Sequence, residues 1–174
     1  MINFLTEIDH HFFKIKITIK MNYLGFKPEN IEKTVDELNQ LLCNYQIYYQ
    51  NLRNYHWNIG GEHFFDLHIK FEELYNEAKV SIDEIAERVL TLRQKPTSTL
   101  AEYLKNADIN ERSTDDPKKM VANILDDHKK IITNLRSVIE TAGDASDEGT
   151  IDMTAGFLAS VEKNSWMLDA WLNR

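Results

Sequence analysis

Apolar residues recur at steps of three and four along much of this chain, and no other feature constrains the fold as strongly. The first such stripe follows Pro28, and its members are Ile31, Val35, Leu38, Leu42, Tyr45, Tyr49 and Leu52. This spacing places side chains on one face of an α-helix, whereas a half-buried strand would show alternation. Only three prolines and six glycines occur in 174 residues, so helices have few interruptions. The chain is therefore expected to be all-α.

Three further segments carry the same periodicity. We expect long helices over about 63–93, 117–142 and 151–172, with glycines at the breaks after the first and third helices. The connection after the second helix is about twenty residues long, and a short helix is predicted over 99–105. Four long helices with two short links and one longer link predict a four-helix bundle of mixed connectivity.

Composition and charge narrow the class of protein. The formal net charge of −8 argues against a protein that mainly coats DNA and is typical of one that attracts cations. The chain contains no run of about eighteen apolar residues, so no membrane span is expected. The single cysteine, Cys43, lies in an apolar helical stretch, where we expect a small buried side chain. One cysteine excludes an internal disulfide framework and favours a reducing, cytoplasmic location.

The first twenty residues differ in pattern from the rest. They include an alternating stretch, KIKITIK, with no partner strand later in the chain, and they lack the pattern of a secretory signal. We therefore expect residues 1–21 to be an N-terminal extension, either mobile or due to a spurious start, with Met21 as an alternative first residue. The domain itself is expected to cover 22–174.

Four polar residues stand out on the predicted second helix. They form two pairs spaced four residues apart, His68 with Glu72 and Asp83 with Glu87. The members of each pair share one helix face, and both pairs fall on the same stripe. The eleven residues between Glu72 and Asp83 correspond to about 16 Å along the axis, too far for one metal ion to bind both pairs. One chain therefore carries two half-sites.

The register of these pairs suggests how the half-sites meet. The pairs are placed symmetrically about the midpoint between residues 77 and 78. If two copies of the helix ran antiparallel about a twofold axis there, each histidine–glutamate pair would face the partner's two carboxylates. Two identical sites would lie between subunits. Imidazole with several carboxylates suits Fe(II), with Zn(II) and Mn(II) as open alternatives.

Simpler interpretations of these residues also stand. Each of the four polar residues follows an apolar one, so each could be a solvated side chain at the edge of the buried face. His56 continues the first stripe, where a hydrogen-bonded core histidine is the alternative to a ligand. We expect His128, on the third helix, to lie at the edge of the core. None of the four long helices contains the Glu-x-x-His motif of a di-iron site inside one bundle.

Taken together, these motifs resemble the Dps proteins, small ferritin-like proteins of starved bacteria. The resemblance covers about residues 22–174 and includes the stretches MNYLGF, DEGTID and WMLDAW. It implies an all-α, ferritin-like four-helix bundle. The residues that carry it most specifically are His56-Trp57-Asn58, His68, Glu72, Asp83 and Glu87-Arg88.

The resemblance also implies an activity and an assembly. Dps proteins form hollow dodecamers, oxidise Fe(II) preferentially with hydrogen peroxide and store the ferric mineral, which protects against oxidative stress. By position, His56, His68 and Glu72 would bind iron from one subunit, and Asp83 and Glu87 from its twofold mate. Trp57, beside this ferroxidase site, is expected to be a packing residue, with interception of oxidising equivalents as a further role.

Three details set this chain apart or extend the comparison. Position 72 is more commonly Asp in the family, and the extra methylene of Glu72 changes the reach of the carboxylate. Glu148 and Asp152 match positions that line threefold pores through which iron enters, although acids are also common at helix N-termini. The chain ends without a lysine-rich tail, so we expect weak or absent DNA binding, with nucleoid association left open.

The alternative function is non-enzymatic. The chain would then be a DNA-compacting or structural shell protein with a weak Zn/Mn site. Solvated carboxylates at all four positions, and the departure at Glu72, would favour this alternative.

Overall fold

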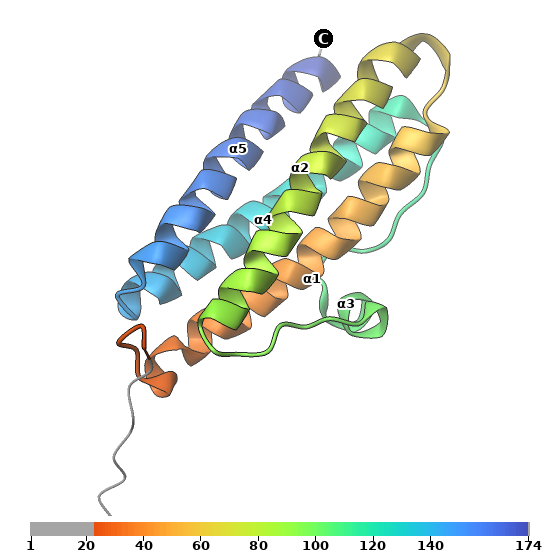
Figure 1. Cartoon of the computed structure of the whole chain (residues 1–174). Helices are drawn as coiled ribbons and strands as arrows, with labels where there is room; N and C mark the ends of the chain where they lie inside the picture. The colour runs from red at the N-terminus through yellow and green to blue at the C-terminus, as the bar shows by residue number, and fades with distance from the viewer. Residues whose placement is uncertain (1–22, 174) are drawn as a thin grey trace, which may run out of the picture.

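Four long helices form an elongated bundle in the computed structural model, which describes residues 23–173 (Figure 1). The expected N-terminal extension, residues 1–21, lies outside the described residues. Every regular element within the described part is helical, as predicted. The elements are α1 (Pro28–Asn58), the 3-10 turn η1 (Gly61–His63), α2 (Phe64–Thr91), α3 (Leu100–Asn106), α4 (Pro117–Asp144) and α5 (Glu148–Leu172). None of these helices is long and apolar enough to span a bilayer.

Capping residues determine where α4 and α5 begin. The side chain of Asp116 accepts hydrogen bonds from the backbone amides of Lys118 and Lys119, so α4 begins where it was predicted. The side chain of Asp147 accepts one from the amide of Thr150, and α5 therefore begins at Glu148, three residues before the predicted start. The link expected between helices 117–142 and 151–172 is therefore reduced to residues 145–147.

The bundle buries the predicted apolar stripes. α1 packs against both α2 and α4, and α4 packs against α5. Two hydrogen bonds join α2 to α5: Lys70 donates to Asn164, and Asn164 donates to Glu77. Cys43 is buried, as expected. Other buried core residues include Leu38, Leu52, Phe71, Ile85, Ile124 and Leu135.

The long connection between α2 and α4 is fixed by amide side chains of α1. Asn44 accepts a hydrogen bond of 2.8 Å from the backbone amide of Asp108. Asn51 accepts one of 3.0 Å from the amide of Arg112 and donates to the carbonyl of Asn110. The predicted short helix is present as α3, which packs on α1. The connection therefore has structure of its own.

A buried ion pair fastens the end of this connection to α4. The guanidinium of Arg112 contacts Asp127, which is fully buried, and lies 3.0 Å from the exposed Asp126. Asn51 also donates to Asp127, at 3.1 Å. Burial raises the pKa of the Asp127 carboxyl to about 6, even though the Asn51 hydrogen bond and the Arg112 charge favour the ionised form.

His128 is not at the edge of the core, and that expectation is wrong. Its side chain is only 1% exposed. Ser165 donates to the carbonyl of Val161, so its Oγ accepts from His128 Nδ1 at 2.8 Å, and Tyr48 donates to Nε2 at 2.7 Å. Burial lowers the pKa of His128 to about 3, so the ring is neutral in the folded protein.

The neutral state of His128 makes stability depend on pH. Between its unfolded pKa of about 6.5 and its folded value of about 3, only the unfolded chain binds the extra proton. The contribution of His128 to the free energy of unfolding should therefore fall by about 1.4 kcal/mol per pH unit as pH decreases through this window. Urea denaturation at fixed protein concentration would measure this slope.

A His128→Gln variant supplies the control for that slope. Glutamine can accept from Tyr48 and donate to Ser165, but it does not titrate. The difference between wild-type and variant stability should shrink as pH falls from about 6.5 towards 3. Parallel curves over this range would contradict a buried neutral histidine.

Candidate metal centre

Three of the expected ligands meet where the end of α1 faces the start of α2. Candidate ligand atoms of His56, His68 and Glu72 all lie within 4.8 Å of one another. The chain reverses through residues 59–63, where Gly61 has a φ of 77°, in the left-handed region that favours glycine. This tight reversal brings the last turn of α1 beside the second turn of α2. Within residues 23–173, no other group of three or more such side chains could hold a metal ion.

The two histidines orient each other through the backbone. Nδ1 of His56 lies 2.9 Å from the carbonyl oxygen of His68, and Nδ1 of His68 lies 2.9 Å from that of His56. A carbonyl oxygen only accepts, so each neutral ring carries its proton on Nδ1. Both Nε2 atoms therefore retain the lone pair that a metal needs. The rings stack with their centroids 3.8 Å apart.

A tyrosine holds the carboxylate of the cluster. The Tyr75 hydroxyl donates to Glu72 Oε1 at 3.2 Å, and its ring meets that of His56 edge-on at 5.3 Å. Burial, followed by the neighbouring Glu72 charge, raises the pKa of the Tyr75 phenol, which keeps its proton. Phe64 stacks on His68 with the ring centroids 4.7 Å apart. Tyr75 was not among the predicted site residues, although its spacing of three from Glu72 places both side chains on one helix face.

The three side chains form an incomplete, open site. His56 is 8% exposed, His68 is half-buried and Glu72 is exposed. Two imidazole nitrogens and a carboxylate suit a divalent metal such as Fe(II), but they leave coordination positions unfilled. Asp83 and Glu87 lie farther along α2, are exposed, and do not join the cluster within one chain. The donor chemistry therefore fits iron, with room for further ligands.

Trp57 does not pack into the core of its own chain. Its side chain is 60% exposed, and the Arg53 guanidinium lies 4.6 Å from the ring centroid. Arg53 also lies 5.2 Å from the Tyr49 ring. The packing role expected for Trp57 is thus not visible within one chain.

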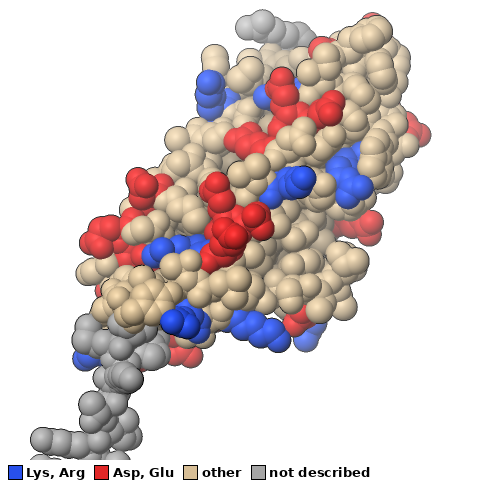
Figure 2. Space-filling model, in the orientation of Figure 1, with Lys and Arg blue, Asp and Glu red and all other residues tan. Residues whose placement is uncertain are grey.

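Glu148 and Asp152 occupy the exposed first turns of α5. The neighbouring Asp147 is buried, where Arg88 contacts it. Arg88 also donates to Thr150 at 2.8 Å, so it ties the end of α2 to the start of α5. On the face seen in Figure 2, carboxylate side chains form several groups over α2 and the beginning of α5. Such groups would raise the local concentration of cations.

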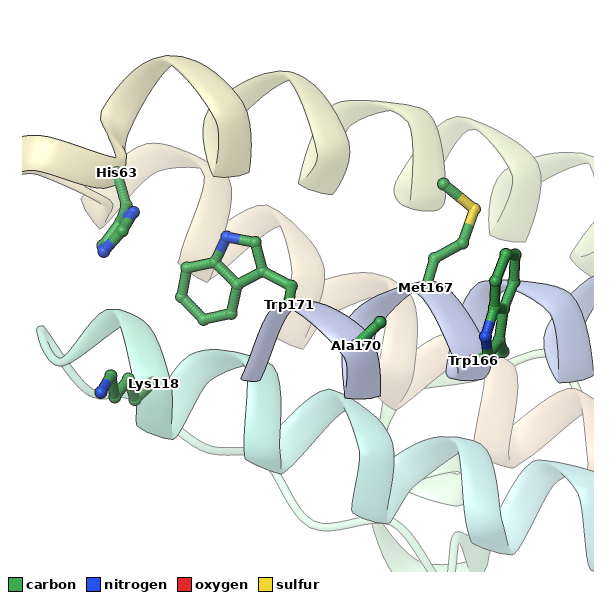
Figure 3. A pocket seen from close by; sticks show the side chains of 6 residues that line it. All are labelled: His63, Lys118, Trp166, Met167, Ala170 and Trp171. Carbon is green, nitrogen blue, oxygen red and sulfur yellow. The ribbon is translucent and has the colours of Figure 1, made fainter. Parts of the chain in front are cut away.

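A separate pocket of about 460 Å³ lies at the other end of α5 (Figure 3). Trp171 closes one side, with its ring edge against His63 at 4.9 Å and its indole nitrogen donating to Asp66. The pocket contains a single imidazole and no carboxylate, so it lacks the ligands of a metal site. Its lining residues are His63, Lys118, Trp166, Met167, Ala170 and Trp171.

Comparisons with known proteins identify the family of this chain. Residues 35–174 match the ferritin-like domain. The DNA protection during starvation protein of Porphyromonas gingivalis is 40% identical over 151 residues, covering 86% of this chain and 95% of the relative. The DNA protection during starvation protein 2 of Bacillus anthracis is 38% identical over 144 residues, covering 82% of this chain and 99% of the relative.

Solved structures give the same answer for the fold. The crystal structure of the Dps protein of Vibrio cholerae O1 is similar with a TM-score of 0.85 and 40% identity, over 87% of this chain and 96% of that one. That protein is described as a member of a broad superfamily of ferritin-like diiron-carboxylate proteins. The domain match, the curated relatives and this shared fold place the chain in one family: it belongs to the Dps proteins, within the ferritin-like group.

Proposed function

We propose that this protein is a ferroxidase that oxidises Fe(II) at sites between paired subunits and stores the ferric product. The convergence of His56, His68 and Glu72, with both Nε2 atoms free to bind, is the observation that carries this proposal. Asp83 and Glu87 of a second copy would complete each site, because the two pairs are symmetric about residues 77 and 78.

The residues would act by binding and orienting two Fe(II) substrate ions. Anionic carboxylates stabilise Fe(III) relative to Fe(II), which favours loss of an electron from each ion. Hydrogen peroxide, the proposed preferred oxidant, takes up these two electrons and two protons, its O–O bond breaks, and two water molecules form. Because both electrons arrive at one site, no hydroxyl radical is released.

The remaining expectations belong to the same proposal. The protein would assemble as a hollow dodecamer in the cytoplasm, protect against oxidative stress, and admit iron through pores lined by Glu148 and Asp152. Zn(II) or Mn(II) would bind to the same ligands as alternatives to iron. With a net charge of −8, binding to DNA would be weak at physiological salt.

The test of this proposal adds the two substrates one after the other. Fe(II) is added anaerobically, hydrogen peroxide follows, and ferric absorbance is recorded for wild-type protein and for an Asp83→Ala, Glu87→Ala variant. We expect rapid oxidation by the wild type and only the slow background rate in the variant. Both replaced side chains are exposed in the single chain, so the helix itself should persist.

Equal, slow traces from both proteins would contradict the proposal. The paired carboxylates would then be solvated surface groups, and a structural or DNA-compacting shell would be the better description. Size-exclusion chromatography of both proteins is the control, because an effect on assembly must be separated from an effect on iron binding.

A further inference from the structure

We infer that Tyr75 is a positioning residue that holds Glu72 as a ligand through a single oxygen, an inference that rests on the proposed function. The hydroxyl donates to Oε1 at 3.2 Å, while Glu72 belongs to the three-residue cluster of candidate ligands. A hydrogen bond to one carboxylate oxygen leaves the other oxygen as the better metal ligand.

Glutamate needs such a contact more than aspartate does. The additional methylene of Glu72 adds a rotatable bond, and the side chain is exposed, so the carboxylate alone has many orientations. Tyr75 lies three residues later on α2, where its hydroxyl can reach back over the same face. The tyrosine therefore reduces the orientations that the longer acid would otherwise sample.

Two aromatic rings contact the ring of Tyr75. Its ring meets His56 edge-on at 5.3 Å and Tyr49 edge-on at 6.1 Å. The Arg53 guanidinium lies over the Tyr49 ring at 5.2 Å. The hydroxyl is thus presented from a fixed ring that also touches one of the imidazole ligands.

Anaerobic Co(II) titration of the full-length protein tests this inference. Co(II) binds N/O ligands similar to those of Fe(II), and it is not oxidised during the titration. Tyr75→Phe removes only the hydroxyl and should weaken Co(II) binding by about fivefold to tenfold, as expected for the loss of one typical hydrogen bond at an exposed carboxylate. The Co(II) absorption band should also change in intensity, because Glu72 is then free to bind through both oxygens.

Two further variants make the result specific. Tyr49→Phe removes a hydroxyl from the adjacent ring, has no contact with Glu72 to lose, and should leave the affinity and the band unchanged. In a Glu72→Asp background, Tyr75→Phe should change the affinity by less than about twofold, because the shorter acid does not depend on the hydroxyl.

The outcomes separate this inference from the proposed function. Equal weakening by Tyr75→Phe in both backgrounds, or none in either, would overturn the positioning role while leaving the ferroxidase proposal intact. If the wild type neither binds Co(II) nor oxidises Fe(II), the proposed function fails and the inference fails with it.

Discussion

Two inactive variants should regain ferroxidase activity when they are assembled together. In the proposed intersubunit site, His68→Ala would disable the half that carries the imidazoles, and the Asp83→Ala, Glu87→Ala pair would disable the carboxylate half. In a mixed pair of subunits, one site has both defects and the other has neither. Random mixing should therefore restore about a quarter of the wild-type rate, since half of the pairs are mixed and half of their sites are intact.

The experiment mixes the unfolded variants, refolds them together and measures Fe(II) oxidation with hydrogen peroxide. Each variant refolded alone provides the inactive baseline, and mixing after separate assembly tests whether subunits must exchange. If the complete site lay within one chain, co-assembly would restore nothing. Full activity of His68→Ala alone would remove that residue from the ligand set.

Replacing Arg112 by methionine should cause the largest loss of stability. The backbone of residue 112 would still donate to Asn51, but the buried Asp127 would lose its cation. Breaking a buried pair from one side costs about 3 kcal/mol at pH 8, where the carboxylate stays ionised. The loss should fall to about 1 kcal/mol at pH 5, because the raised pKa of Asp127 lets it take up a proton there.

Urea denaturation of the wild type and the variant at both pH values would measure this difference. The matched control adds Asp127→Asn to Arg112→Met, which replaces the unpaired charge with a neutral amide that can still accept from Asn51. Most of the stability at pH 8 should return. An equal loss at both pH values would show that the packing of Arg112, and not its charge, matters.

Periodicity was sufficient to predict the helices because burial on one face decides their formation. The stripe from Ile31 to Leu52 is buried apart from the half-buried Tyr49. The ends were less accurate, since a cap depends on one side chain reaching one amide. Asp147 and Thr150 have the spacing of such a cap, yet the apolar periodicity placed the start of the last helix at about residue 151.

The candidate site was predictable in part. The spacing of His68 and Glu72 fixes their shared face, and the resemblance to the Dps proteins predicted His56 as a third ligand; the structure brings all three together. The burial of His128 was not predictable, because it requires Tyr48 of α1 and Ser165 of α5 to meet on either side of the ring. The pairing with Asp83 and Glu87 of another copy stays a prediction, since it concerns two chains.

The reciprocal bonding of His56 and His68 has a consequence for how this protein can change over evolution. Each imidazole is anchored to the main chain of the opposite helix, so the candidate ligands themselves set the spacing between α1 and α2. Residues of the loop between α1 and α2 that do not need a positive φ can then be substituted without moving the candidate ligands. Substitution of either histidine would remove its stacked ring but keep the main-chain carbonyl that accepts from the other imidazole, so the two positions can change one at a time.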